Sequence, residues 1–236
     1  MNDKENKVKL NKYGRIAFTG PFRWLIIQGI LFFVSAGHFN IPRAWIFFSI
    51  AFTMALINSI ILYRHAPDLL NQRGELKKDV KTWDKVLLLI YFSVLLLIIP
   101  VIAGLDVGRF TWSGLGIPFM VLGIALYLFS NLFILWSMLT NRHFEAMVRI
   151  QKDRDHKVIS TGPYRIVRHP GYVGMALTSI IIPLIIGSLY ALIPGGICFV
   201  VVIIRTNLED KTLQNELEGY AEFTKKTRYR LLPGIW

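Results

Sequence analysis

The sequence predicts an all-α, polytopic integral membrane protein with about six transmembrane helices. The composition indicates this class, because hydrophobic residues make up 53% of the 236 residues and charged residues only 18%. The mean hydropathy is +0.46. The apolar residues also occur in long blocks between basic, polar segments, which is typical of membrane-spanning helices and not of a soluble core.

Six apolar spans follow one another along the chain. The last two are short, and each contains a proline, Pro183 or Pro194. We expect these two spans to form a helical hairpin that turns around Gly187 and Ser188. The fourth span is long enough to tilt or to extend beyond the bilayer. The expected spans are residues 22–37, 42–63, 84–105, 112–139, 171–187 and 189–205.

The basic residues indicate the orientation of the spans. With the N-terminus in the cytoplasm, 25 of the 27 lysines and arginines fall on the cytoplasmic side, and only Arg43 and Arg109 lie on the other. This asymmetry is the one that the positive-inside rule describes. Topology and anionic lipid therefore explain the net charge of +12 without a nucleic-acid partner. We expect both termini in the cytoplasm, at the plasma membrane of a prokaryote or the endoplasmic reticulum of a eukaryote.

The polar segments indicate how the chain is organised. We expect a polar cytoplasmic tail at residues 1–20, since no signal-peptide cleavage site follows the first apolar run. Transmembrane helices 1–4 then occupy 21–139, and a functional region occupies 140–236, with a loop, the helical hairpin and an amphipathic C-terminal helix. Three cytoplasmic segments are too long to be simple connectors: 64–83, 140–170 and 206–236.

Several kinds of chemistry are disfavoured by the sequence. The single cysteine, Cys198, lies in an apolar run, so it is expected in the core and no disulfide framework is possible. No G-x-S-x-G serine motif is present, and the G-L-G at 114–116 lacks a preceding strand and the rest of a dinucleotide motif. The five histidines have no metal-ligand spacing, so no metal is expected; they are His38, His65, His143, His156 and His169.

Residues 161–172, TGPYRIVRHPGY, form a rigid polar segment between apolar runs. Gly162-Pro163 predicts a turn. His169 precedes a proline and is expected to be extended, while Pro170 suits the first turn of the next helix. Three side chains of this segment could line a pocket at the mouth of that helix: Tyr164, His169 and Tyr172. The alternative is an interfacial anchor of tyrosines and arginines at headgroup level.

A second candidate segment, residues 203–223, follows the last span. Arg205 and Glu209 lie four residues apart and so share one helix face, which by itself predicts no more than a surface ion pair. The expected hairpin, however, returns them to the end at which residues 168–172 lie. An apolar stripe continues beyond them and predicts that the tail helix packs back either onto the protein or onto the membrane interface; it consists of Leu213, Leu217, Tyr220 and Phe223.

These two segments together resemble a known family. H-x-V-x-x-x-G-P-Y-x-x-x-R-H-P-x-Y-x-G runs from His156 to Gly174, and R-x-x-x-E-(E/D) follows at Arg205, Glu209 and Asp210. The compound motif resembles the isoprenylcysteine carboxyl methyltransferase family, which is related to the phospholipid N-methyltransferases. V-R-I-Q-x-x-R-x-H at 148–156 and the ending R-Y-R-L-L-P-G-I-W resemble its prokaryotic members, so the resemblance covers about 140–236.

The resemblance implies a membrane methyltransferase that uses S-adenosylmethionine. It implies that Glu209 holds the cofactor and that Arg205 meets the carboxylate of the substrate, which makes these two the expected catalytic residues. Gln151 is carried over with a spacing to His156 that differs among members. The residues that the resemblance places around the cofactor are Gln151, His156, Lys157, Val158, Ile159, Tyr164, His169, Pro170, Gly171, Tyr172 and Glu209.

The sequence departs from the family at two of these positions. Asp210 stands where many members have a second glutamate, which weakens any role for this acid and leaves Glu209 intact. Gly171 stands where serine is frequent, and we expect this change to be harmless in a pocket lined by backbone.

The expected reaction is methyl transfer to the carboxylate of an isoprenylcysteine or another lipidic acid. Such an acceptor is ionised at neutral pH, with a reference pKa of about 4, and needs no general base. Arg205 could then orient it with a forked pair of hydrogen bonds. Three alternatives remain open: methylation of a phospholipid amine, a sterol-type reductase that binds NADPH, and a lipid-binding protein without catalysis.

Overall fold

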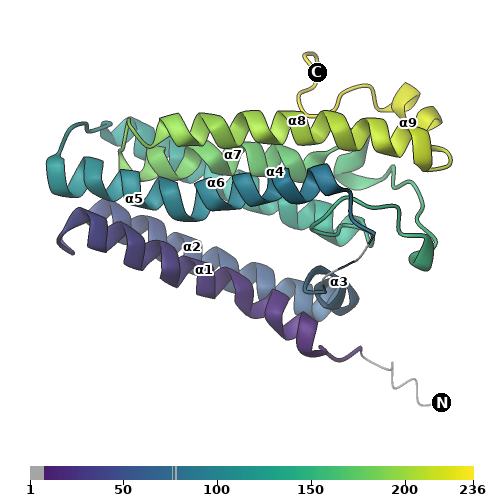
Figure 1. Cartoon of the computed structure of the whole chain (residues 1–236), viewed down its shortest axis with the longest axis horizontal. Helices are drawn as coiled ribbons and strands as arrows, with labels where there is room; N and C mark the ends of the chain where they lie inside the picture. The colour runs from purple at the N-terminus through teal and green to yellow at the C-terminus, as the bar shows by residue number, and fades with distance from the viewer. Residues whose placement is uncertain (1–7, 76, 78) are drawn as a thin grey trace.

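The computed structural model describes residues 8–75, 77 and 79–236, and these form helices and no strand. The long helices run side by side along one axis (Figure 1). The prediction of an all-α, polytopic membrane fold is thereby confirmed. The α-helices are α1 Lys12–Ala36, α2 Pro42–His65, α3 Pro67–Arg73, α4 Thr82–Ser93, α5 Ile99–Gly104, α6 Ile117–Thr140, α7 Pro170–Ile186, α8 Leu192–Glu216 and α9 Tyr220–Lys226.

In the described part of the chain, five helical stretches are long and apolar enough to cross a membrane. They are α1, α2, the continuous stretch Thr82–Phe110, α6 and α8. The sixth apolar helix, α7, has only 17 residues and forms the short arm of the predicted hairpin. Gly187 ends α7 with a φ of 98°, in the left-handed region that glycine adopts readily, and the turn around it agrees with the sequence.

Two boundaries differ from the expected ones by ten residues or more. α1 begins at Lys12 and not near residue 22, because the Asn11 side chain caps it by accepting a hydrogen bond from the Gly14 N–H at 2.9 Å. Residues 12–20 of the expected polar tail are therefore helical, whereas residues 1–7 lie outside the described part. α8 continues eleven residues past the expected end at Arg205, so membrane span and site segment form one rigid helix.

The third span contains two π-helical turns, η1 at Val94–Ile98 and η2 at Leu105–Phe110, on either side of α5. Pro100 stands near the start of α5. A proline removes one backbone donor and clashes with the preceding turn, and a wider π turn relieves that clash. The span therefore stays helical through its proline.

Arg43 and Arg109 lie at the end of the bundle opposite α3 and α9. Arg43 Nε donates to the Ile185 carbonyl at 2.8 Å, and its Nη2 donates to the Leu184 carbonyl at 2.9 Å. Arg109 Nε donates to the Ser35 carbonyl at 2.8 Å. Both arginines thus satisfy carbonyls at the C-terminal ends of α7 and α1, where cations are favourable.

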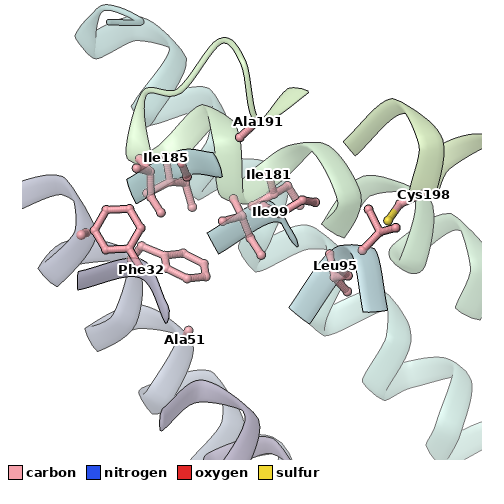
Figure 2. Close-up of a cluster of buried hydrophobic side chains, with 14 of the residues drawn as sticks. Phe32, Ala51, Leu95, Ile99, Ile181, Ile185, Ala191 and Cys198 are labelled. Carbon is pink, nitrogen blue, oxygen red and sulfur yellow. The ribbon is translucent and has the colours of Figure 1, made fainter. Parts of the chain in front are cut away.

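The main core lies where α1, α2, the third span, α7 and α8 meet. Phe32, Ile99, Ile181 and Cys198 are fully buried in it, and Figure 2 shows these side chains converging from different helices. The burial of Cys198 confirms the prediction of a core cysteine. α7 approaches α6 closely at Gly174, where a Cβ atom would clash with Ile134. This tight packing fixes the position of α7 and of the segment that precedes it.

Candidate active site

One cavity collects every residue that the sequence predicts for the site. It lies at the end of the bundle that holds α3 and α9, which we call the site end, where the 141–169 segment meets the start of α7 and the last turns of α8 (Figure 1). The predicted residues in its wall are Gln151, His156, Lys157, Val158, Ile159, Tyr164, His169, Pro170, Gly171, Tyr172, Arg205 and Glu209.

The backbone of residues 161–172 has the predicted shape. Gly162 adopts a φ of 55° and opens a short 3-10 helix, η4 at Gly162–Arg165. His169 is non-helical, with φ −123° and ψ 63°, and Pro170 begins α7. The N–H groups of Arg168 and His169 donate to carbonyls of the C-terminal segment, at 2.9 and 3.0 Å. The chain's last residues therefore accept the hydrogen bonds of the non-helical backbone before α7 and fix its position.

Glu209 presents a carboxylate to the cavity and has no cationic partner among the described residues. The Tyr172 hydroxyl donates to Glu209 Oε2. The His169 ring stacks on Tyr172, with centroids 5.6 Å apart and planes 6° from parallel. No lysine, arginine or histidine among the described residues lies within 4.0 Å of the Glu209 carboxylate. The site thus has an anionic group that fits the ammonium of a cationic cofactor.

Arg205 does not pair with Glu209, its neighbour on the helix face. Its Nε lies 2.6 Å from Asp84 Oδ1, and its Nη2 donates to Asp84 Oδ2 at 3.3 Å and to the Ala146 carbonyl at 2.9 Å. The guanidinium also lies over the Tyr172 ring, 4.7 Å from its centroid. The remaining nitrogen, Nη1, has only the weak acceptor sulfur of Met175, at 3.9 Å.

Asp84 is a site residue that the sequence did not reveal. It is fully buried in the first turn of α4, and besides Arg205 it accepts the Val148 N–H at 2.7 Å. An aspartate in the first turn of a helix is ordinarily explained by the helix dipole. The sequence therefore shows no sign that Asp84 forms a buried ion pair with Arg205 of α8, more than a hundred residues away in the chain.

Asp210 is fully buried and joins four elements around one carboxylate. Arg168 donates to it through Nε at 2.8 Å and Nη2 at 3.0 Å, and Arg230 Nε donates at 2.8 Å. His169 Nε2 lies 3.2 Å away, and the Tyr220 hydroxyl donates at 3.0 Å. Asp210 therefore has a full set of partners, although the departure from glutamate at this position had weakened its expected role.

The loop that carries Gln151 is held by a histidine pair. Gln151 Nε2 donates to the His143 carbonyl at 2.7 Å, and Arg154 Nη1 donates to Gln151 Oε1 at 3.0 Å. The rings of His143 and His156 lie 4.6 Å apart, between centroids. Burial lowers the pKa of His156 to about 4, and the nearby His143 is the second cause of this shift. Both imidazoles are therefore neutral at physiological pH.

We expect this histidine pair to make the fold sensitive to acid. A pKa lowered in the folded protein means that the unfolded chain binds protons more readily, so stability falls as the pH drops from 6.5 towards 4. The melting temperature of detergent-purified protein, followed with a thiol-reactive dye that reports exposure of Cys198, should fall between about pH 7 and about pH 5. His156→Gln should flatten this dependence. His65→Gln, at an exposed histidine, is the control, and an equal flattening there would contradict the assignment.

The apolar wall of the cavity comes from the predicted stripe. Leu217, Tyr220 and Phe223 are buried together with Tyr164, and Val158 packs against them. The tail therefore does pack back onto the protein, as predicted. Lys157 lines the cavity, but its side chain is 66% exposed and pairs with Asp155 at 2.6 Å, so its ammonium points towards solvent.

Gly171 allows a close approach that the sequence did not predict. A Cβ atom at this position would overlap the ring of Phe144. The serine that is frequent here in the family would therefore displace this ring. The expectation that glycine is harmless at this position stays a prediction. Phe144 in turn lies under the Arg73 guanidinium, 5.4 Å from ring centroid to Cζ.

Comparison with known proteins supports a methyltransferase. Residues 118–218 match the family model described as phospholipid methyltransferase. This stretch contains α6 except its first residue, the whole of α7 and α8, and the whole of the His156–Gly174 motif. The resemblance drawn from the sequence is confirmed at this level, because this family is related to the isoprenylcysteine carboxyl methyltransferases. The match indicates a membrane methyltransferase and leaves the acceptor open. No curated protein matches the chain.

Proposed function

We propose that the protein is an S-adenosylmethionine-dependent methyltransferase that methylates the carboxylate of an isoprenylcysteine or another lipidic acid in the membrane. One observation carries this proposal: a carboxylate without a cationic partner among the described residues, Glu209, and a guanidinium, Arg205, line the same cavity. The first suits the cationic cofactor and the second an anionic acceptor. The match of residues 118–218 to phospholipid methyltransferases supports the reaction class.

The chain offers a partner for each part of the cofactor. S-adenosylmethionine supplies an electrophilic methyl group on a positively charged sulfur. Glu209 would pair with its ammonium group. The apolar side chains of Val158, Leu213 and Leu217 line the same cavity and would contact the nucleoside. The Tyr172 hydroxyl, already bonded to Glu209, holds that carboxylate in place.

Arg205 would orient the acceptor more than activate it. A carboxylate is already ionised at neutral pH and needs no base. The Nη1 group of Arg205 keeps free donor capacity towards the cavity, while Asp84 neutralises the other edge of the guanidinium. This shared charge limits how strongly Arg205 withdraws electrons from the attacking oxygen. Positioning of two reactants can supply on the order of 7–11 kcal/mol of the barrier.

The cavity also reaches the lipid-facing side of the bundle. Leu88, Phe92 and Met175 line it at the membrane side, and Phe92 is 44% exposed on the outer face of α4. An acyl or prenyl chain could therefore enter from the bilayer while the soluble cofactor arrives at the site end. We propose that the site end faces the cytoplasm, as the distribution of basic residues indicates.

A second candidate is N-methylation of a phospholipid amine, because the matching family is described as phospholipid methyltransferase. An amine must lose a proton during transfer, and Glu209 would be the base. The two reactions give different products, since a methyl ester is hydrolysed by mild alkali and a methylamine is not. Transfer of labelled methyl groups to S-farnesylcysteine or to phosphatidylethanolamine vesicles, followed by alkali treatment, separates them. Alkali-stable label would replace the first candidate by the second.

The cofactor assignment predicts the effect of removing the Glu209 charge. Glu209→Gln should weaken binding of S-adenosylmethionine by about tenfold or more, because a charge-assisted hydrogen bond is lost. Calorimetric titration of detergent-purified protein measures this. Glu218→Gln, at an exposed acid on the same tail, should leave the affinity unchanged. Equal affinity of Glu209→Gln and wild type would remove Glu209 from the cofactor site.

A further inference from the structure

We propose that Arg73 of α3 and Arg205 of α8 form a subsite for the anionic group, carboxylate or phosphate, of the lipid acceptor. This inference rests on the proposed function and adds a residue from the 64–83 segment, whose role the sequence left open. α3 lies outside the matched residues 118–218. The subsite would therefore be an acceptor-specific addition to the part of the chain that carries the family's motif.

Arg73 is a cation in the cavity wall and has no carboxylate partner among the described residues. Its Nη1 donates to the Phe144 carbonyl at 3.1 Å, and its guanidinium lies over the Phe144 ring. No acid among the described residues lies within 4.0 Å of it. An arginine has five N–H donors, so most of its hydrogen-bonding capacity is open to a ligand.

The two guanidiniums line the wall of the same cavity. Arg73 bonds the Phe144 carbonyl and Arg205 the Ala146 carbonyl, at 3.1 and 2.9 Å, so both contact one short stretch of backbone. Residues two apart in a chain lie at most about 7 Å from each other between Cα atoms. Burial, and then repulsion by Arg205, lowers the pKa of Arg73 to about 10. Arg73 nevertheless remains charged at neutral pH.

The nearby acids leave this pair with an excess of positive charge. Asp84 is committed to Arg205 at 2.6 Å. Glu145, the acid that raises the pKa of Arg73, bonds Arg149 through both oxygens, at 2.7 and 2.8 Å. Shielding an uncompensated cation from water is costly, and an anion between Arg73 and Arg205 would remove that cost.

The surroundings of the pair fit the head of a lipid acid. The cavity continues from the arginines to Leu88, Phe92 and Met175, which suit a hydrocarbon chain. A carboxylate or phosphate could accept hydrogen bonds from both guanidiniums, as forked donors match planar or tetrahedral oxyanions. An uncharged amphiphile of the same length would bury the same chain and leave Arg73 unpaired.

Binding of matched amphiphiles tests the subsite. The probes are palmitate, hexadecyl phosphate and hexadecanol, titrated into the detergent-purified full chain. Wild type should bind the two anions about tenfold or more tightly than the alcohol, from the strength of hydrogen bonds to charged groups. Arg73→Gln should bring this ratio close to one, and Arg73→Lys should give an intermediate ratio, because the charge stays and the fork is lost. Arg64→Gln removes an exposed charge near α3 and should keep the ratio of wild type.

Three results would overturn the subsite. One is equal binding of anions and alcohol by wild type, and another is full discrimination by Arg73→Gln. The third is displacement of palmitate by inorganic phosphate at similar concentration, which would assign the arginines to a free anion and not to a lipid head. A melting temperature equal to that of wild type shows that the fold of each variant is intact.

The same titrations separate this inference from the proposed function. Anion discrimination that depends on Arg73, in a protein that does not bind S-adenosylhomocysteine, would keep the subsite and contradict the methyltransferase. Cofactor binding without anion discrimination would contradict the subsite and leave the methyltransferase in place, with an amine acceptor favoured.

Discussion

Asp84→Asn is expected to abolish methyl transfer and to destabilise the protein by about 3–5 kcal/mol, because it leaves the buried Arg205 guanidinium without its counter-charge. Asp84 is fully buried, and Arg205 is 3% exposed. For a chain of this length, the loss corresponds to a fall in melting temperature of roughly 10 °C. The neutral amide would also lose the strong hydrogen bond that fixes Nε of Arg205, so the guanidinium would no longer point reliably at the acceptor.

Thermal unfolding and methyl transfer should be measured on the same samples. Asp68→Asn makes the identical change in the first turn of α3, at an exposed position, and should alter neither quantity. The double variant Asp84→Asn, Arg205→Met removes both charges and should recover stability without recovering activity. Normal turnover by Asp84→Asn would show that the Asp84–Arg205 pair is not part of the catalytic arrangement.

The membrane fold was predictable because hydropathy and the positive-inside rule act over many residues. The long apolar blocks and the confinement of Arg43 and Arg109 to the opposite end required no knowledge of side-chain contacts. Element ends were less predictable. They depend on single interactions such as the Asn11 cap, which moved the start of α1 by ten residues.

The two motif segments of the site were predictable as a set, because a hairpin must bring its two ends to the same side. Their partners were not. Asp84 resembles an ordinary acid at a helix start, and Arg73 resembles one more arginine among the basic residues on one side of the membrane. Each acquires its role from a contact with a carbonyl of residues 144–146 or with α8. No periodicity or charge pattern within α3 or α4 encodes those contacts.

Asp210→Asn is expected to disrupt the site end as a whole, because one carboxylate holds both Arg168 and Arg230 together with Tyr220. Burial, followed by the repulsion of Asp210, raises the pKa of the Tyr220 phenol, so that hydroxyl remains a donor and depends on the carboxylate as acceptor. Without that charge, two arginines repel each other at the joint between α8 and the C-terminal segment.

The free energy of unfolding is again expected to fall by about 3–5 kcal/mol. Cofactor binding should be weakened more strongly by Asp210→Asn than by Asp84→Asn. Asp210 anchors the C-terminal segment through Arg230. That segment accepts hydrogen bonds from the N–H groups of Arg168 and His169, and the His169 ring stacks on Tyr172 in the cavity wall. Release of that segment would free the backbone before α7, on which the proposed cofactor pocket depends. Asp210→Glu keeps the charge and should retain more affinity, despite the extra methylene in a filled space. Calorimetric titration with S-adenosylhomocysteine measures the difference in affinity, and Glu218→Gln is the exposed control. An affinity of Asp210→Asn equal to that of wild type would show that the pocket does not depend on the Asp210 carboxylate.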